Sequence, residues 1–386
     1  NQIRYYQEAY SLALDKVVAA KGAFPESKEK RIMKYEMLPI NNPSWKSVMV
    51  TRHLPEALKG LETLSKNLWW CWNENAKALF KSVDAEVWHN SGHNPMAVLD
   101  VVTLKRFQAL SKDASFMAQY ESVMKDFNDY MSLKKDRKDP SVAYFCMEYG
   151  LDSSLSIYSG GLGILAGDYL KETSDMNVNL VAVGLLYRYG YFTQVLSAQG
   201  DQVARYDAQN FTKIPAEPVM DKDGNWLTTS VAFPGRNLTA RIWKVAVGRT
   251  DLYLLDTDYE ANIDEDRQVT YHLYGGDWEN RLKQELLLGI GGIHALRNLG
   301  IKPEIYHCNE GHAAFTGLER LREYVSQANL DFGEALEIVR SSSLFTTHTP
   351  VPAGHDAFDE GMLRKYIGHY PQLLKVDWET MMSLGK

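Results

Sequence analysis

The sequence predicts an α/β protein in which a doubly wound, mostly parallel sheet follows an all-helical segment. Beyond about residue 139, short runs rich in β-branched and aromatic residues alternate with helical patterns. That alternation is typical of parallel strands joined by crossover helices. Between about residues 53 and 135, apolar residues instead recur at helical spacing with few β-branched runs.

Four runs are predicted to be strands, with helices between them. The strands are VAYFCM (142–147), NLVAVGLL (179–186), EIYHCN (304–309) and SLFTTHT (343–349), and the helices are expected at 163–176, 280–298, 311–327 and 332–340. Residues 226–256 alternate apolar and polar side chains, which predicts antiparallel hairpin strands inserted into the sheet.

Three segments are expected along the chain. Residues 1–47 read as a helix and a polar, proline-containing linker that could belong to an upstream domain. Residues 48–138 form the helical extension, and residues 139–386 form the α/β domain. The first residue is Asn and the final MMSLGK stops without a closing element, so both ends are expected to be cuts.

The composition and charge of the chain limit the kinds of molecule that it is expected to bind and the compartment in which it is expected to work. The chain has 386 residues, a formal net charge of −7 and no run of Lys or Arg, which excludes nucleic acid and anionic membranes as favoured partners. Cys71, Cys146 and Cys308 are far apart and odd in number, so no disulfide framework is expected and a reducing cytoplasm is favoured. The apolar runs are shorter than the ~20 residues of a membrane span, and no signal segment opens the chain.

Polar residues gather where the predicted strands end. In an open α/β sheet, ligands bind outside the carboxyl ends of the strands. The residues at these ends are Glu148, Asp256, Asn309, Glu310, Gly311, His312 and His348. Several strand ends therefore bring carboxylates, an amide and two imidazoles to one edge, which predicts a site there.

Three glycines, Gly160, Gly161 and Gly163, precede or open the helix expected after the first strand. Free backbone N–H groups and a positive dipole end at such a position suit an anion. A simple tight turn is an equally good interpretation. GLGILA also fits a dinucleotide fingerprint, but Val183 and Gly184 stand where that site needs an acidic residue, so a dinucleotide is not expected.

Other candidates have plainer interpretations. HCNEGH could suggest a metal, but His307 and Asn309 lack a third ligand, so a satisfied buried histidine is favoured. Glu148 could form an ion pair near the sheet edge, and His348 and His355 could belong to a structural loop. The tryptophans of NLWWCWN could stack on sugars, but the helical spacing of the apolar residues around them favours core packing, namely Leu64, Leu68 and Trp72.

The motifs AYFCMEYGL, IYSGGLGILAGDYLKETSDM, VAVGLLYRYGYFTQ, NRLKQE, HCNEGHAAF and TTHTPVPAGHDAF occur in this order. Together they resemble the N-terminal half of the α-glucan (glycogen or maltodextrin) phosphorylases over about residues 50–386. The helical segment at 50–135 resembles the N-terminal extension of the bacterial short-form branch.

This resemblance implies the first of the two Rossmann-like domains of a GT-B glycosyltransferase. It implies retaining phosphorolysis of α-1,4-glucan by inorganic phosphate to glucose 1-phosphate, with pyridoxal phosphate as cofactor. In the family, the loop matching Gly160, Gly161, Leu162 and Gly163 lies against the substrate phosphate and the transferred glucosyl unit.

The resemblance also assigns single residues. His348 matches the histidine that hydrogen-bonds the glucosyl unit and is the catalytic candidate. Glu148 and His312 match residues that line the same cleft, and Asn309 is a further candidate for substrate binding. Tyr274 to Asp277 lies where the family carries a mobile gating loop, which makes Asp277 a candidate as well.

Two departures from the family pattern limit what is expected. Gly150 stands where many members carry an aromatic residue near the cofactor. The family's Schiff-base lysine and cationic phosphate clamp belong to a C-terminal half of which no motif occurs here. The chain is therefore expected to be half of an enzyme, inactive alone, and a homodimer is one expected assembly. The alternatives are a stand-alone glucan-binding module and a sugar-nucleotide glycosyltransferase.

Overall fold

The computed structural model describes residues 54–133, 138–348 and 356–385. The predictions made for residues 1–47, Pro350, Pro352 and His355 lie outside these ranges. Residues from Arg52 onward form one compact unit. A boundary near residue 138 stays a prediction.

The first described range contains helices and no strand. Short 3-10 turns at Glu56–Leu58 and Leu68–Trp72 accompany α2 (Gly60–Lys66), α3 (Glu74–Val83), α4 (Ala85–Asn90), α5 (Pro95–Val101), α6 (Leu104–Leu110) and α7 (Ala114–Ser132). Helices α3 to α7 each begin after a side chain that accepts hydrogen bonds from the first turn. These caps are Asn73, Asp84, Asn94, Thr103 and Asp113.

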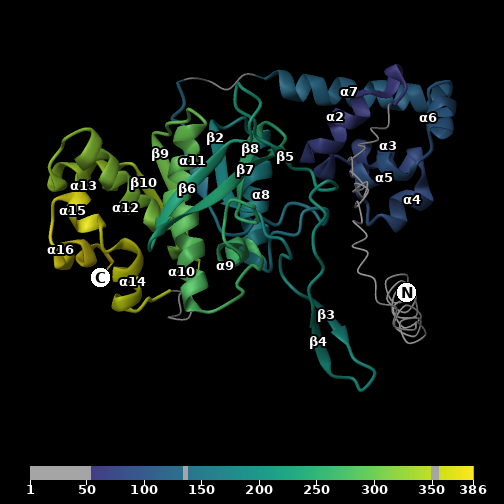
Figure 1. Ribbon diagram of the computed structural model, residues 1–386. Coiled ribbons are helices and arrows are strands. Elements are labelled where there is room, and N and C mark those ends of the chain that lie inside the picture. Colours follow the sequence, from purple (N-terminus) through teal and green to yellow (C-terminus); the bar gives the residue numbers. More distant parts are fainter. Residues whose placement is uncertain (1–53, 134–137, 349–355, 386) are drawn as a thin grey trace, which may run out of the picture. The chain divides into compact units, whose positions relative to one another are not determined.

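A mixed sheet is built from the rest of the chain (Figure 1). Its strands are β1 (Val142–Phe145), β2 (Leu180–Leu185), β5 (Glu217–Pro218), β6 (Thr228–Phe233), β7 (Arg236–Val247), β8 (Thr250–Asp256), β9 (Ile305–Asn309) and β10 (Ser343–Thr346). The order is β10-β9-β1-β2-β8-β7-β5, with β6 also paired to β7. The β10 to β8 stretch is parallel and the pairs of β7 are antiparallel, which confirms the predicted parallel sheet with an antiparallel insertion.

Helices cover both faces of this sheet. The helices that follow β1 along the chain are α8 (Gly161–Asp175), α9 (Asp264–Arg267), α10 (Trp278–Leu286), α11 (Gly292–Asn298), α12 (Phe315–Arg322), α13 (Phe332–Ser341), α14 (Glu360–Ile367), α15 (Tyr370–Leu374) and α16 (Trp378–Met382), of which α8 and α11 lie on opposite faces of the sheet. On one face, Tyr169 of α8 contacts Tyr144 of β1 with ring centroids 4.9 Å apart. On the other, Gly292 of α11 lies against Phe145 and Val183. This arrangement is consistent with a Rossmann-like fold.

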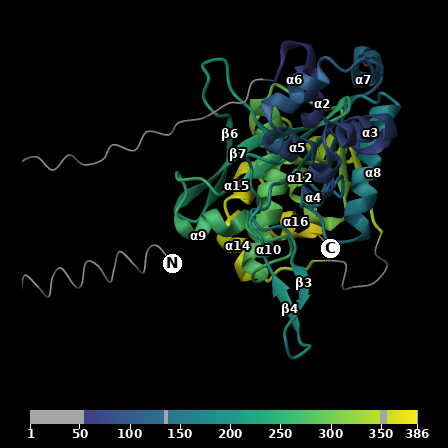
Figure 2. The ribbon, with the colours of Figure 1, turned by 90° about the vertical axis from the view of Figure 1, so that its right-hand side faces the viewer.

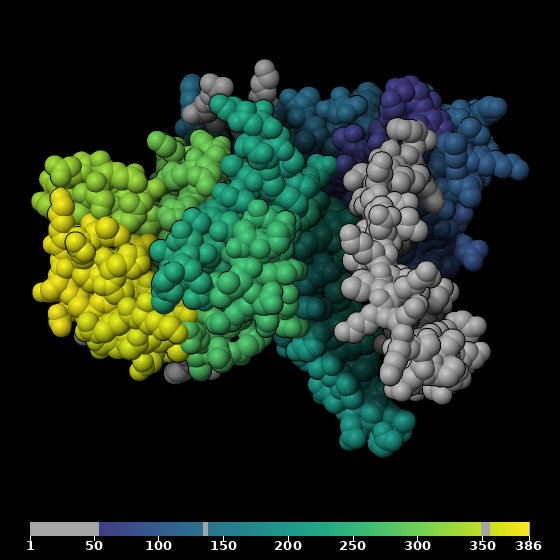
Figure 3. Space-filling view, viewed as in Figure 1, coloured from purple at the N-terminus to yellow at the C-terminus, as the bar shows by residue number. Residues whose placement is uncertain are grey.

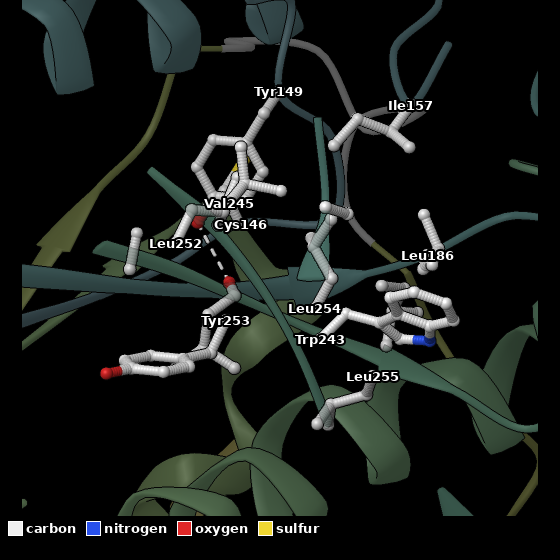
Figure 4. Close-up of a cluster of buried hydrophobic side chains, with 14 of the residues drawn as sticks. Cys146, Tyr149, Ile157, Leu186, Trp243, Val245, Leu252, Tyr253, Leu254 and Leu255 are labelled. Carbon is white, nitrogen blue, oxygen red and sulfur yellow. Dashed lines mark hydrogen bonds between the residues drawn. The ribbon is translucent and has the colours of Figure 1, made fainter. Parts of the chain in front are cut away.

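The strands at the centre of the sheet are apolar because both of their faces are buried. In β8, the residues from Leu252 to Leu255 are all buried. Figure 4 shows part of this core, including Trp243 and Val245 from β7. In the helical range, Leu64, Leu68, Trp69 and Trp70 are buried, and partly buried Trp72 packs against the same core, so the core-packing interpretation of the tryptophan-rich motif is confirmed.

One arginine ties the helical range to the sheet. Arg249 lies in the turn between β7 and β8, and its guanidinium donates hydrogen bonds to the carbonyl oxygens of Tyr130 in α7 (2.8 Å) and of Ser174 and Asp175 in α8 (2.7 and 2.9 Å). It also lies over the Tyr130 ring, 3.8 Å from its centroid. The tie holds α7 and α8 against one end of the sheet.

A separate hairpin, β3 (Thr193–Leu196) and β4 (Gln202–Arg205), pairs with no other described strand. Figures 1 and 2 show it pointing away from the sheet, and it projects in the space-filling view as well (Figure 3). Every residue of β4 is exposed. None of the helices in the described ranges is long and apolar enough to cross a membrane.

Candidate functional site

A cavity of about 440 Å³ lies at the carboxyl ends of β1 and β9. Its lining comes from the start of α8, from the loop before α10, from the residues after β9 and from the segment that leads to α14. The lining residues are Leu162, Tyr274, Gly275, Gly276, Asp277, Trp278, Arg281, Glu310, Gly311, His312 and Asp356. Leu162, Asp277 and His312, all predicted site residues, therefore meet at this cavity.

The glycine loop comprises residues 159–163 and opens α8. Its first two amides are occupied, because Ser159 and Gly160 donate to Glu148 Oε2 at 2.8 and 3.4 Å. The Gly163 amide donates to the Gly160 carbonyl oxygen at 3.1 Å. Within the described ranges, the amides of Gly161 and Leu162 have no acceptor. Of the loop's backbone donors, these two are left for an anion.

Gly163 and Gly161 differ in their surroundings. A Cβ on Gly163 would lie 2.6 Å from Tyr158 Cβ and 2.7 Å from Glu148 Oε2, so Gly163 allows a close approach. A Cβ on Gly161 would meet nothing within 4 Å. Gly161 also lies outside the left-handed region of backbone angles. Backbone strain therefore does not require glycine at Gly161.

Glu148 follows β1 and is 3% exposed. Its Oε1 accepts a hydrogen bond from the Tyr274 hydroxyl at 2.6 Å, and its Oε2 accepts those from the glycine loop. Burial, and then the Glu148 carboxylate, raise the pKa of Tyr274, so its hydroxyl stays a donor. Among the described residues no Lys or Arg pairs with Glu148, which does not support the ion-pair interpretation.

Residues Tyr274 to Asp277, called the gate loop here after the mobile loop that the resemblance implies, connect the site to α10. Tyr274 has φ = 56° and Gly276 has φ = 87°, both in the left-handed region. Asp277 caps α10 by accepting from the Asn280 amide at 2.8 Å, and Asn280 Nδ2 donates to the Gly275 carbonyl at 2.9 Å. The Asp277 side chain thus has a structural partner as well as a place at the cavity.

His312 is buried beneath the cavity. Its Nε2 accepts a hydrogen bond from the Met147 amide at 3.0 Å. Burial, followed by the nearby charge of Arg281, lowers the pKa of His312 to about 3. The imidazole is therefore neutral at pH 7, with its proton on Nδ1.

Asn309 and His348 meet at the adjacent strand ends without lining the cavity. The Asn309 side-chain oxygen lies 2.9 Å from His348 Nε2, and the His348 amide donates to Glu310 Oε1 at 2.5 Å. His348 is exposed. Glu310, which does line the cavity, has φ = 58°. The pair is thus joined to the cavity wall through Glu310.

An arginine and two carboxylates near the cavity were missed as a group by the sequence analysis. Arg281 contacts Asp356 at 2.7 Å and Glu285 at 3.0 Å. Burial, and then its hydrogen bond with Asp356, raise the pKa of Glu285 to about 9. Arg281 and Glu285 both lie in the quoted motif NRLKQE, but their partner is 71 positions beyond Glu285, and no pattern in the sequence connects it to them.

Two candidates at the strand ends serve other contacts. Asp256 pairs with Arg241 at 2.9 Å and accepts from Trp243 Nε1 at 3.1 Å, both from the antiparallel strand β7. His307 is buried, and its Nε2 lies 2.5 Å from Thr346 Oγ1. In the described ranges, no group of three or more His, Cys, Asp or Glu is arranged to hold a metal ion.

The chain is similar over most of its length to several known proteins. It is 45% identical over 337 residues to the glycogen phosphorylase of Mycobacterium tuberculosis and 42% identical over 340 residues to the maltodextrin phosphorylase of Thermococcus litoralis. These matches cover 82% and 86% of this chain. The chain is homologous to the α-glucan phosphorylases. The resemblance first found in its motifs is confirmed.

The phosphorylase of Aquifex aeolicus, named glycogen phosphorylase, is 36% identical over 331 residues, covering 85% of this chain and 47% of the relative. The chain spans 39% and 40% of the mycobacterial and Thermococcus phosphorylases. The family model described as "Protein of unknown function (DUF3417)" matches residues 54–155, which include the helical range and β1.

Proposed function

We propose that this chain is the N-terminal part of an α-glucan phosphorylase. The reaction is cleavage of α-1,4-glucan by inorganic phosphate, which gives glucose 1-phosphate with retention of configuration. The observation that carries the proposal is the identity of 42–45% to a glycogen and a maltodextrin phosphorylase over more than four fifths of this chain. In this proposal, the α/β domain at residues 139–386 is the first of the two Rossmann-like domains of a GT-B enzyme.

Phosphate is the anion proposed for the glycine loop. The amides of Gly161 and Leu162 are free of acceptors within the described ranges, and Leu162 lines the cavity. Two such N–H groups at the start of a 15-residue helix stabilise an anion without adding a formal charge. Gly160 and Gly163 shape the loop, because their amides are already engaged.

His348 is proposed to hydrogen-bond a hydroxyl of the transferred glucosyl unit. Its Nε2 faces the Asn309 side-chain oxygen, so the tautomer that donates from Nε2 presents Nδ1 as an acceptor. Such a contact gains strength as the sugar flattens toward an oxocarbenium ion. Neutral His312 and Asp277, which line the cavity, complete the proposed substrate-binding set. Glu148 and Asn309, predicted as substrate-binding, are instead proposed to hold the glycine loop and His348 in place, because they are buried and do not line the cavity.

Pyridoxal phosphate is the cofactor implied by the family, and it is held by a lysine in enzymes of this chemistry. The residues that line the described cavity include one cation, Arg281, and no lysine. Arg281 is committed to Asp356 and Glu285. The described cavity does not fit the cofactor by itself, so the proposal gives pyridoxal phosphate to the complete enzyme and derives no step through it.

The test is phosphorolysis by the full-length protein that carries this chain. With maltodextrin and inorganic phosphate, it should release glucose 1-phosphate, and the 386-residue chain alone should not. The His348→Ala variant should lower kcat and kcat/KM together by about 10²-fold for the folded protein, with a melting temperature lowered only by the loss of the Asn309 contact. Glucosyl transfer from a sugar nucleotide, or glucan binding without turnover by the full-length protein, would overturn the proposal.

A further inference from the structure

We propose that Glu148 and Tyr274 form a bracket that locks the glycine loop and the gate loop together, so that neither loop rearranges alone. In this bracket Tyr274 is a positioning residue: it acts on the anion-binding amides through Glu148. The inference rests on the proposed function only for the identity of the anion.

Each oxygen of one carboxylate holds a different loop. Oε1 accepts from the Tyr274 hydroxyl at 2.6 Å, and Oε2 accepts from the Ser159 amide at 2.8 Å. The Ser159 hydroxyl adds a contact at 3.3 Å to the same Oε2. Tyr274 lies 126 positions from Glu148 in sequence, so this contact joins parts of the site that the chain itself does not connect.

The carboxylate depends on both sets of donors. Glu148 is 3% exposed, and water cannot readily replace a donor that leaves. The nearby cation, Arg281, lies over the Tyr274 ring at 5.2 Å and is committed to Asp356 and Glu285. Loss of the Tyr274 hydroxyl therefore leaves a buried oxygen without its donor, and the carboxylate must shift or recruit a new partner.

The gate loop has an unfavourable backbone conformation and lies beside space into which it can move. Tyr274 holds a left-handed backbone conformation (φ = 56°), which a non-glycine residue adopts only when its surroundings enforce it. Gly275, Gly276 and Asp277 line the 440 Å³ cavity on one side and a second cavity of about 310 Å³ on the other. The loop is thus a thin wall between two spaces.

The bracket also fixes the position and direction of the free amides of Gly161 and Leu162. Gly161 and Leu162 directly follow the two residues whose amides Glu148 holds. When the gate loop opens and withdraws the Tyr274 hydroxyl, Glu148 is freed to move, and the start of α8 loses its fixed position. An anion bound at Gly161 and Leu162 should in turn favour the closed gate loop.

The experiment is hydrogen exchange of backbone amides in the 386-residue chain, without glucan or phosphate. The test variant is Tyr274→Phe, and the matched control is Tyr271→Phe, which removes a hydroxyl with no hydrogen bond among the described residues. In Tyr274→Phe, exchange of the hydrogen-bonded amides of Ser159, Gly160 and Gly163 should rise about tenfold or more, together with exchange of the Gly275 amide in the gate loop. The control should leave residues 159–163 unchanged.

A rise confined to residues 271–281 would overturn the bracket, since the two loops would then move independently. The Glu148→Gln variant adds a second measurement. Its amide can accept from Ser159 and donate to the Tyr274 oxygen, so the amides of Ser159, Gly160 and Gly163 should stay protected. Failed phosphorolysis by the full-length protein would count against the proposed function and not against the bracket, because exchange is measured without substrate.

Discussion

Gly161 and Gly163 lie in the same helical turn but are expected to respond differently to a methyl group. Alanine at Gly161 meets open space, so the free energy of unfolding should hardly change. In the full-length protein, however, the methyl would crowd a phosphate at the adjacent amides, and kcat/KM for phosphate should fall by about 10²-fold. Steady-state kinetics and thermal unfolding on one preparation measure both quantities.

Gly163→Ala is the matched control, because its Cβ would lie 2.6 Å from Tyr158 and 2.7 Å from Glu148. Such overpacking should cost about 1–3 kcal/mol of stability. Full activity in Gly161→Ala would mean that the loop is only a turn and that phosphate binds elsewhere.

His312 makes the stability of the fold depend on pH. Its pKa is lowered to about 3 in the folded state, while an unfolded histidine titrates near 6.5. The unfolded chain therefore takes up the proton first as pH falls. The contribution of this residue is complete above about pH 6.5 and is lost on the way to pH 3, with about 2 kcal/mol lost between pH 7 and pH 5.

The measurement is the free energy of unfolding at several pH values for the wild type and for His312→Gln. The glutamine oxygen can accept the Met147 amide but does not titrate. The wild type should be the more stable protein at pH 7, and its advantage should shrink by about 2 kcal/mol at pH 5. Parallel curves for the two proteins would show that His312 is not buried as a neutral ring.

At the scale of elements, we expect the short turn between β7 and β8 to contribute substantially to the free energy of unfolding. Arg249→Ala would remove the donors to three carbonyl oxygens in α7 and α8. Hydrogen bonds from a charged donor contribute about 1.5–3 kcal/mol, so a loss of about 2 kcal/mol is expected. Urea unfolding of the 386-residue chain measures it, with Arg340→Ala as control because Arg340 and its partner Glu337 are both exposed. Equal midpoints for the two variants would contradict this role.

Elements with strong local signals could be predicted from the sequence. The four predicted strands and the predicted helices are confirmed. They could be predicted because β-branched runs and helical spacing depend only on residues that are close in sequence. The π-helical turn at Leu287–Gly291 could not be predicted. A Cβ on its Gly289 would lie 2.7 Å from Phe315 Cβ, so this turn packs against residues distant in sequence.

Part of the candidate site could also be predicted from the sequence. Strand ends led to Glu148, Asn309, His312 and His348, because parallel strands bring their carboxyl ends to one edge. The same rule included Asp256, which instead pairs with Arg241 across the antiparallel insertion. It could not reveal that Glu148 binds Tyr274, since that contact depends on the path of the gate loop.

At the scale of the whole molecule, the sheet interleaves early and late parts of the sequence. β1 and β2 lie between β9 on one side and β8 on the other, with parallel pairing at both borders. Long-range parallel pairing of this kind forms slowly, because distant segments must meet before contacts stabilise them. The N-terminal strands are therefore held by strands that follow them by 70 or more positions along the chain.

The projecting hairpin has a consequence for proteolysis. Two strands without further support are marginally stable in water, so the exposed backbone of such a hairpin is open to proteolysis. Arg205, at the end of fully exposed β4, offers trypsin a cleavage point. A cut there divides the chain between β2 and β8, yet the earlier fragment stays inserted in the sheet built by the later one. The nicked protein would hold together as two interlocked pieces, and only unfolding would separate them.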